Sequence, residues 1–331
     1  MPACPHVAQL GARRALLALL GSAVAWPAWL QAQDSGKPWR IAFLAAGGAP
    51  RPGQFSTFDA VTAGLRDRGF TALQTQAWFG EGRAEALPAL AQQVLAWRPD
   101  VIVTNLTPAT LAAQRATRSV PIVMAGSGDP VATGLVQSLA RPGGNVTGVA
   151  ALGPELAAKS VELLRELRPG LKRLGVLAHG TDSFTPAMLA AVTQAATALG
   201  IDLQVERVVA PGEYAAAFGR WWRQRAEAVF VQPSLPGAPA AALALQHGLP
   251  SASSVPGFVQ QGGLLAYAND LAEIARLVVD TLDRILRGAS PATLPVQQNT
   301  RFDLLINLRT ANALGIAVPP PLLLRATEVI E

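Results

Sequence analysis

The sequence predicts an α/β protein of two Rossmann-like lobes, each with a parallel sheet flanked by helices, and with a ligand cleft at the hinge between them. Short apolar runs alternate with amphipathic helical patterns, which is typical of βαβ units. This alternation occurs twice, over 38–148 and over 149–267. Half of the 331 residues are hydrophobic, so the chain is long and apolar enough to bury two cores of ordinary size.

Each element of the first lobe follows from its local pattern. Apolar runs too short for a helix predict buried strands, and longer amphipathic stretches predict helices. Gly69 ends one helix as a C-cap, and Pro99 stops another. The expected strands are 40–44, 71–77, 101–103 and 122–124, and the expected helices are 55–69, 84–96 and 109–117.

The second lobe repeats this order, and a tail returns to both lobes. The expected helices are 154–167, 186–199, 214–225 and 239–247, and the expected strands are 173–178, 203–209, 228–231 and 263–268. The tail holds an amphipathic helix over 270–287, a strand over 302–308 and a short helix over 309–314. We expect 268–294 to rejoin the first lobe and 295–331 the second.

Residues 1–32 have the pattern of a secretory signal peptide. Arg13 and Arg14 precede an apolar run, 15–25, that is too short to span a membrane. Small residues of the kind that signal peptidase recognises precede two candidate cleavage sites, one after Ala25 and one after Ala32. We favour cleavage after Ala32. The alternative is a buried N-terminal helix. We therefore expect export to the periplasm, by the general secretory or the twin-arginine route.

Cysteine and charge exclude several classes of function. The single cysteine, Cys4, precedes the apolar run, so we expect no lipid anchor and no thiol chemistry in the mature chain. Loss of Arg13 and Arg14 lowers the 27 basic residues to 25, against 22 acidic ones, and these charges are dispersed. That argues against nucleic-acid binding, which requires a clustered basic face. We expect no cofactor, and a monomer.

The stretch 120–149 carries the strongest sign of a ligand site. A buried strand over 120–124 runs directly into a small-residue loop, 125–130, that holds two glycines, a serine and Asp129. In an open α/β sheet, ligands bind at the carboxyl ends of the strands. Glycines let the backbone approach a small solute closely. We therefore expect this loop to face the cleft.

Several segments, in order from Trp39 to Glu331, resemble one family. The most specific are Gly128-Asp129-Pro130-Val131 and the run LARPGGNVTG over 139–148. With segments such as Arg40 to Leu44, Pro99 to Val103 and Ile306-Asn307-Leu308, they resemble the ABC transporter substrate-binding proteins whose better-known members bind tryptophan or tyrosine. The resemblance implies a type I periplasmic-binding-protein fold, a cleft that closes on a small solute, and docking on an ABC permease. The permease and its ATPase are other chains.

Three first-lobe loops match the cleft side of this family. The N–H groups at the start of the helix near 107, with the Thr107 and Thr110 hydroxyls, suit a carboxylate. Asp129 suits an ammonium group, and the two together describe an α-amino acid. The alternatives are an N-cap for Thr107 and a turn acid for Asp129. The candidate ligand-binding residues here are Ala46, Gly47, Gly48, Asn105, Thr107, Thr110, Ser127 and Asp129.

The second lobe departs from the family pattern. Many members carry an Asn-Pro pair after its first strand, whereas this chain has Ala178-His179-Gly180. This departure leaves the identity of the ligand open. For Tyr267 the alternative is a hinge or core aromatic. The candidate ligand-binding residues are His179, Asp182, Ser183, Phe184, Gln232, Ser234, Tyr267 and Asn269.

Catalysis and metal binding are not expected. His179, Asp182 and Ser183 have the residue types of a hydrolase triad, but adjacent in one loop they cannot readily take its geometry. After residue 32 the only histidines are His179 and His247, far apart in sequence. The resemblance to the substrate-binding family implies a periplasmic solute-binding protein of an ABC importer that captures an amino acid or a carboxylate-bearing aromatic by hinge closure. The alternatives are a ligand-sensing module for a membrane sensor and, third, an exported α/β hydrolase.

Overall fold

The computed structural model describes residues 38–50 and 53–331, and residues 38–331 form one compact unit. The predicted signal peptide, 1–32, lies outside the described residues. In the described part of the chain, no helix combines the length and the apolar character needed to cross a membrane.

The first lobe is built on a six-stranded sheet in which all paired strands are parallel. Its strand order is β11-β5-β4-β3-β1-β2. The strands are β1 (Trp39–Ala45), β2 (Leu73–Phe79), β3 (Val101–Asn105), β4 (Ile122–Ser127), β5 (Val146–Ala150) and β11 (Gln297–Gln298). Its helices are α1 (Thr57–Asp67), α2 (Leu87–Ala96), α3 (Thr107–Ala116) and α9 (Leu271–Leu286), with a 3₁₀ turn over Ala84–Ala86 before α2.

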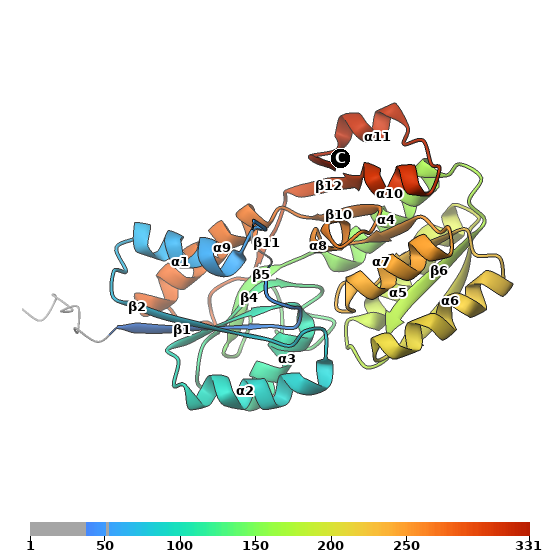
Figure 1. The fold of residues 1–331 in the computed structure, drawn as a ribbon. Coiled ribbons are helices and arrows are strands. Elements are labelled where there is room, and N and C mark those ends of the chain that lie inside the picture. The colour runs from blue at the N-terminus through green and yellow to red at the C-terminus, as the bar shows by residue number, and fades with distance from the viewer. Residues whose placement is uncertain (1–37, 51–52) are drawn as a thin grey trace, which may run out of the picture. The chain divides into compact units, whose positions relative to one another are not determined.

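Alternation along β1 sends side chains to two separate cores. Ile41 and Phe43 pack with α1 and α9 on one face, while Ala42 and Leu44 pack with α2 and α3 on the other. Successive strand residues point to opposite faces, so one short apolar run supplies both cores. Figure 1 shows α1 and α9 over one face of this sheet and α2 and α3 over the other.

The second lobe has a seven-stranded sheet in the order β13-β12-β10-β9-β8-β6-β7, parallel except for the β10–β12 pair. The strands are β6 (Arg173–His179), β7 (Asp202–Val208), β8 (Ala228–Val231), β9 (Ser251–Ser253), β10 (Leu265–Asn269), β12 (Phe302–Asn307) and β13 (Glu328–Ile330). The helices are α4 (Gly153–Leu167), α5 (Thr185–Ala198), α6 (Tyr214–Arg223), α7 (Gly237–Gln246), α8 (Gly257–Gln260), α10 (Leu308–Ala313) and α11 (Pro320–Arg325), with a 3₁₀ turn over Pro211–Glu213.

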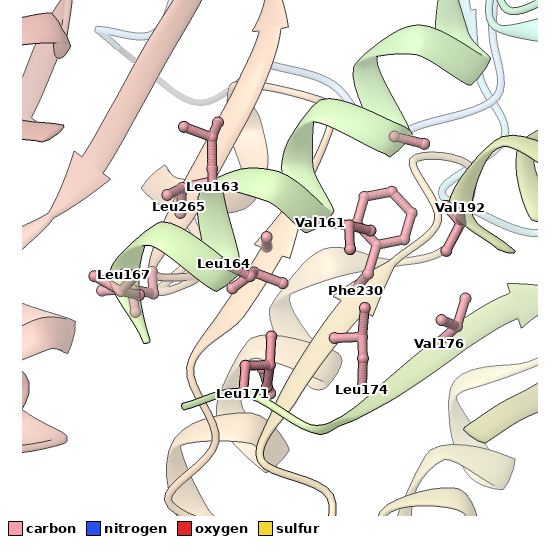
Figure 2. Packing of buried hydrophobic residues seen from close by; sticks show 14 of the residues in the cluster. Val161, Leu163, Leu164, Leu167, Leu171, Leu174, Val176, Val192, Phe230 and Leu265 are labelled. Atoms are coloured by element: carbon pink, nitrogen blue, oxygen red, sulfur yellow. The ribbon is translucent and has the colours of Figure 1, made fainter. Parts of the chain in front are cut away.

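The larger core of this lobe lies between its sheet and helices α4 and α5. Figure 2 shows Val161 and Leu164 of α4 above Leu174 of β6 and Phe230 of β8, with Val192 of α5 beside them. The opposite face holds α6, where Trp221 is fully buried and its Nε1 donates to the carbonyl of Gln204 at 2.9 Å. Both faces of the sheet are thus covered, as expected for largely parallel strands.

The chain passes between the lobes three times. It crosses after β5, after β10 and after β11, through residues 151–152, residue 270 and residues 299–301. Because β11 pairs with β5, the last return to the second lobe lies a few residues beyond the expected boundary near 295. Leu152 in the first crossing has a φ of 50°, a left-handed conformation that is uncommon for a leucine.

Candidate functional site

A cavity of about 70 Å³ lies between the loops at the carboxyl ends of the strands of both lobes. We call it the central cavity. Its position is the one at which open α/β sheets bind ligands. Six of the predicted ligand residues line it: Asn105 and Thr107 from the first lobe, Asp182, Phe184 and Ser234 from the second, and Asn269 at the hinge.

The first-lobe wall is the start of α3. Thr107 is the first residue of this helix, and its Oγ1 accepts a hydrogen bond from the N–H of Gly128 at 3.1 Å. The N-cap alternative for Thr107 is therefore wrong, because Leu106 holds the cap position with a φ of 66°. A non-glycine residue at positive φ is strained, and such strain gathers at functional sites. The helix N-terminus that lines the cavity has the polarity to attract an anion.

Three of the predicted residues, Thr110, Ser127 and Asn105, support this wall through hydrogen bonds. Thr110 Oγ1 lies 2.8 Å from Thr104 Oγ1 and 2.9 Å from Ser127 Oγ, and all three hydroxyls are fully buried. This chain of hydroxyls joins α3 to β3 and β4. Asn105 adds a further tie, because its Nδ2 donates to the carbonyl of Ala125 at 3.0 Å.

The second-lobe wall is organised around the carboxylate of Asp182. Its Oδ1 accepts from the N–H of Phe184 at 2.9 Å. Its Oδ2 accepts from Gln232 Nε2 at 2.9 Å and from Ser234 Oγ at 2.7 Å. Gln232 is itself fixed, since its Oε1 accepts from the backbone N–H of His179 at 2.9 Å. Asp182 is thus a buried acid of the cavity lining that is already oriented by three donors.

Phe184 closes the cavity against glycine backbone. A Cβ added to Gly128 would lie 2.5 Å from the Phe184 ring, and one added to Gly153 would lie 2.6 Å from it. Real Cβ atoms do not approach this closely, so only glycine fits at either position. Gly128 belongs to the first lobe, and therefore this ring also joins the two lobes.

His179 is buried at the end of β6, with 1% of its surface exposed. Its Nδ1 accepts from the N–H of Thr181 at 3.2 Å. Its Nε2 is buried and has no hydrogen-bond partner among the described residues. Burial lowers the pKa of His179 below its ordinary value, while the nearby carboxylates of Asp182 and Glu85 oppose this shift. Burial therefore favours the neutral form of the ring.

The structure does not place every predicted residue in the lining of the central cavity. Asp129 Oδ1 accepts from the N–H groups of Val131 at 3.2 Å and Ala132 at 2.9 Å, which is the turn-acid alternative. Tyr267 packs against Phe302 with ring centroids 5.8 Å apart, which is the core-aromatic alternative. A ligand contact for either residue stays a prediction.

The remaining predicted residues lie beside the central cavity. Gly47 and Gly48 line an adjoining hollow that also contains Asn105 and Ser234. Ala46 is buried, and its carbonyl accepts from the N–H of Gly82 at 2.8 Å. Ser183 is exposed and lines a separate groove with His179.

Sequence reasoning missed two residues that hold the site together. Asn299 Nδ2 donates at 2.8 Å to Asn269 Oδ1, while Asn269 Nδ2 donates at 3.1 Å to the carbonyl of Ala151. These bonds tie the end of β10 to the crossings at Ala151 and Asn299. Thr185 Oγ1 lies 2.8 Å from the carbonyl of His179 and 3.0 Å from Gln232 Oε1. The position of Thr185, directly after the predicted residue Phe184 and at the start of a helix, was the sequence feature that could have identified it.

Comparison with known proteins identifies the family. A family model described as ABC transporter substrate binding protein matches residues 50–330. The chain belongs to this family. It is a family of solute-binding proteins, and no group of three or more His, Cys, Asp or Glu side chains suited to a metal ion occurs within 38–50 and 53–331.

Individual relatives agree with this membership. A tyrosine-binding protein of Clostridioides difficile (strain R20291) is 25% identical to this chain over 235 residues. The match covers 69% of this chain and 66% of the relative, which is just under two thirds of the relative's length. A conserved domain protein of Vibrio cholerae is 26% identical with a TM-score of 0.79, covering 88% of this chain and all of that one.

The fold of the solved relatives is that of the type I periplasmic binding proteins, as the sequence predicted. A domain from a Streptococcus species, solved with L-Trp, has a TM-score of 0.78 at 24% identity and covers 89% of this chain and 100% of its own. A ligand-free, open substrate-binding protein of Clostridium difficile has a TM-score of 0.61 at 21% identity, covering 88% and 99%.

Proposed function

We propose that this chain is the periplasmic receptor of an ABC importer and captures an α-amino acid with an aromatic side chain, which occupies the central cavity together with the adjoining hollow lined by Gly47 and Gly48. The observation that carries the proposal is the chemistry of the two walls. The α3 N-terminus at Thr107 offers donors for a carboxylate, and Asp182 across the cavity offers an acceptor for an ammonium group. These are the two charged groups of an α-amino acid.

Phe184 supports an aromatic side chain for the ligand. Its ring is part of the cavity lining and is held in place by the backbone of Gly128 and Gly153. Aromatic rings pack favourably on one another in offset or edge-on arrangements. A tyrosine-binding relative and a neighbour solved with L-Trp are consistent with this class of ligand.

Capture proceeds by hinge closure. The solute contacts both walls at once only when the lobes are together, so it stabilises the closed state through contacts that the open state lacks. Asn269 is positioned to couple the two events, because it lines the cavity and also bonds to the crossings at Ala151 and Asn299. The closed form then docks on a membrane permease driven by an ATPase, both of which are other chains.

Isothermal titration with matched ligands tests the proposal. L-Tryptophan and L-tyrosine should bind, whereas tryptamine, which lacks the carboxylate, and indole-3-propionate, which lacks the amine, should bind at least tenfold more weakly (~1.4 kcal/mol for each lost charged contact). Equal affinity for L-tryptophan and indole-3-propionate would remove the ammonium site from the proposal.

Two acid variants decide which carboxylate holds the ammonium group. Asp182→Asn should weaken binding of L-tryptophan, while Asp129→Asn should leave it unchanged, because Asp182 lines the central cavity and Asp129 does not. The opposite result would restore the sequence-based assignment of Asp129. Circular dichroism of both variants checks that the fold is retained.

Export is the cellular part of the proposal. Residues 1–32 carry the signal-peptide pattern, and the family membership is consistent with a protein that works outside the cytoplasm. Mass spectrometry of the protein recovered from the periplasm should give an N-terminus just after Ala32 or Ala25. A full-length chain that stays in the cytoplasm would contradict this.

A further inference from the structure

The adjoining hollow beside the central cavity, lined by Gly47 and Gly48, contains one ionisable side chain. Its volume is about 370 Å³, and it shares Asn105 and Ser234 with the lining of the central cavity. Among the described residues that line it, Glu81 is the only one that can carry a charge. Most of the others are glycines, prolines and aliphatic residues from both lobes. A ligand group that enters this hollow therefore meets a single carboxylate in otherwise uncharged surroundings.

Backbone hydrogen bonds fix the loop that carries Glu81. The N–H groups of Gly80, Glu81 and Gly82 all donate to carbonyl groups of residues 45–47, at distances of 2.8, 3.2 and 2.8 Å. Glu81 lies between the two glycines with a φ of 53°, a left-handed conformation that is uncommon for a residue with a side chain. Such strain persists only where the surrounding structure imposes it. The loop therefore holds Glu81 at the carboxyl end of β1, the edge of the sheet at which ligands bind.

The carboxylate of Glu81 lies over the backbone of the hollow and is unpaired. A Cβ added to Gly48 would lie 2.6 Å from Glu81 Oε2, so the carboxylate is folded over a glycine that itself lines the hollow. The next residue, Gly82, lies against the ring of Pro236 from the second lobe. In the part of the chain that the structure describes, no donor and no cation pairs with the Glu81 carboxylate. A free acceptor thus lies where the two lobes meet.

The charges of the two linings select the group that this acceptor would bind. Asp182 is the only ionisable residue described in the lining of the central cavity, and Glu81 has the same place in the adjoining hollow. The α-ammonium group proposed for the ligand meets Asp182, which leaves Glu81 for the other end of the molecule. A ligand carboxylate there would be repelled, and an apolar group would displace water from Glu81 without replacing its hydrogen bonds. An N–H or O–H group would form a charge-assisted hydrogen bond.

We propose that Glu81 is a specificity-determining residue, whose carboxylate accepts a hydrogen bond from a donor at the far end of the ligand side chain. An indole N–H or a phenol O–H is a donor of this kind. This role rests on the proposed function, because it takes an α-amino acid in the central cavity as given. It adds that the receptor separates aromatic side chains of similar shape by the presence of a donor, and that it rejects those that end in a carboxylate.

Isothermal titration with ligands that differ at the end of the ring tests this role. L-Tyrosine should bind about fivefold more tightly than L-phenylalanine, which lacks the donor, and than O-methyl-L-tyrosine, in which the donor is blocked. The factor is modest because Glu81 is exposed and water competes for its carboxylate. L-Phenylalanine is smaller than L-tyrosine and the methyl ether is larger, so equal losses separate the donor from a change in volume. 4-Carboxy-L-phenylalanine should bind more weakly than either.

Two variants assign the selectivity to one residue. In Glu81→Ala, L-tyrosine and L-phenylalanine should bind equally, and the penalty for 4-carboxy-L-phenylalanine should shrink. Glu85→Ala is the matched control, because Glu85 is an exposed acid four residues further on that lines neither hollow, and it should keep the fivefold preference. Circular dichroism checks that both variants are folded.

The outcomes separate the role of Glu81 from the proposed function. Equal affinity of the wild type for L-tyrosine, L-phenylalanine and the methyl ether would overturn the role of Glu81 and leave the amino-acid site in place. A preference for L-tyrosine that persists in Glu81→Ala would overturn it as well. No binding of any of the three compounds would instead contradict the proposed function, and the role of Glu81 with it.

Discussion

The carboxylate of Asp182 offers the sharpest test of how the second-lobe wall is held. Asp182→Asn keeps the shape of the side chain but replaces one acceptor oxygen with an NH₂ group. Oδ1 can still accept from the N–H of Phe184. At the other position the new donor faces Gln232 Nε2, formerly 2.9 Å from Oδ2, and the hydroxyl of Ser234, formerly 2.7 Å from it.

The expected cost follows from which partners can adapt. The Ser234 hydroxyl can rotate and accept from the new amide, so its bond is partly recovered. Gln232 cannot flip, because its Oε1 already accepts from the N–H of His179 at 2.9 Å. One charge-assisted hydrogen bond is therefore lost, and bonds of this kind contribute about 1.5–3 kcal/mol. We expect a loss of about 2 kcal/mol in the free energy of unfolding.

Urea unfolding followed by circular dichroism measures this loss. With a slope of about 3 kcal/mol per molar, the midpoint should fall by about 0.7 M. Asp202→Asn, on an exposed residue of the same lobe, is the control and should not move it. In a double-mutant cycle with Ser234→Ala, the two changes should be non-additive by about 1 kcal/mol. An unchanged midpoint in Asp182→Asn, or strict additivity, would refute the argument that these side chains act as one network.

Three further predictions concern the core, the contact between the lobes and a buried base. Trp221→Ala should cost about 3–5 kcal/mol in urea unfolding, whereas Trp222→Ala, at a residue 69% exposed, should cost less than about 0.5 kcal/mol; equal losses would contradict the packing. Gly82→Ala should weaken ligand binding and raise the radius of gyration measured by X-ray scattering, because Gly82 has a φ of 71° and an added Cβ would lie 2.4 Å from a proline ring of the other lobe. Gly47→Ala is the control, because an added Cβ there has no atom within 4 Å. The same change in both variants would contradict this prediction. Burial lowers the pKa of His179, so the unfolded state binds more protons than the folded state between that lowered pKa and 6.5. The free energy of unfolding should therefore fall as the pH falls through this window. In His179→Gln it should depend less on pH, and an unchanged pH dependence in that variant would contradict this prediction.

The elements with strong local patterns were predictable from the sequence. The helix expected over 270–287 is observed at Leu271–Leu286, where Asp270 caps its first turn by accepting from two N–H groups. The strand expected over 173–178 is observed at Arg173–His179. In both, apolar periodicity agrees with the buried face, so local and tertiary preferences coincide.

The elements that were missed lack such a pattern. Strand β9 reads Ser-Ala-Ser over Ser251–Ser253, yet it is fully buried between two other strands, and its hydroxyls bond to backbone groups. Residues 130–140, between β4 and β5, form a series of turns and bends. Strand β11 is only two residues long and exists because β5 offers it an edge. Non-local pairing created these elements, and no local window of sequence contains it.

For the site, the sequence located the loops but not the direction of each side chain. Loops at the carboxyl ends of parallel strands meet at one edge, which is why Asn105, Asp182 and Asn269 line the same cavity. Thr110 lies in the first turn of α3, just after an equally polar loop, yet its hydroxyl points inward to Ser127. A one-dimensional pattern does not distinguish a polar group that faces a cavity from one that satisfies a buried neighbour.

What the sequence by itself determined was the class of molecule: two α/β lobes, a signal-peptide pattern, no cysteine after Cys4, and a resemblance strong enough to name the family. What only the tertiary structure decided was which polar groups work together. Asp182, Gln232 and Ser234 form one network, although about fifty residues separate the first from the other two. Periodicity and composition are local properties and survive in the linear chain. The geometry of a hydrogen-bond network is a property of the folded backbone and exists only after the strands have paired.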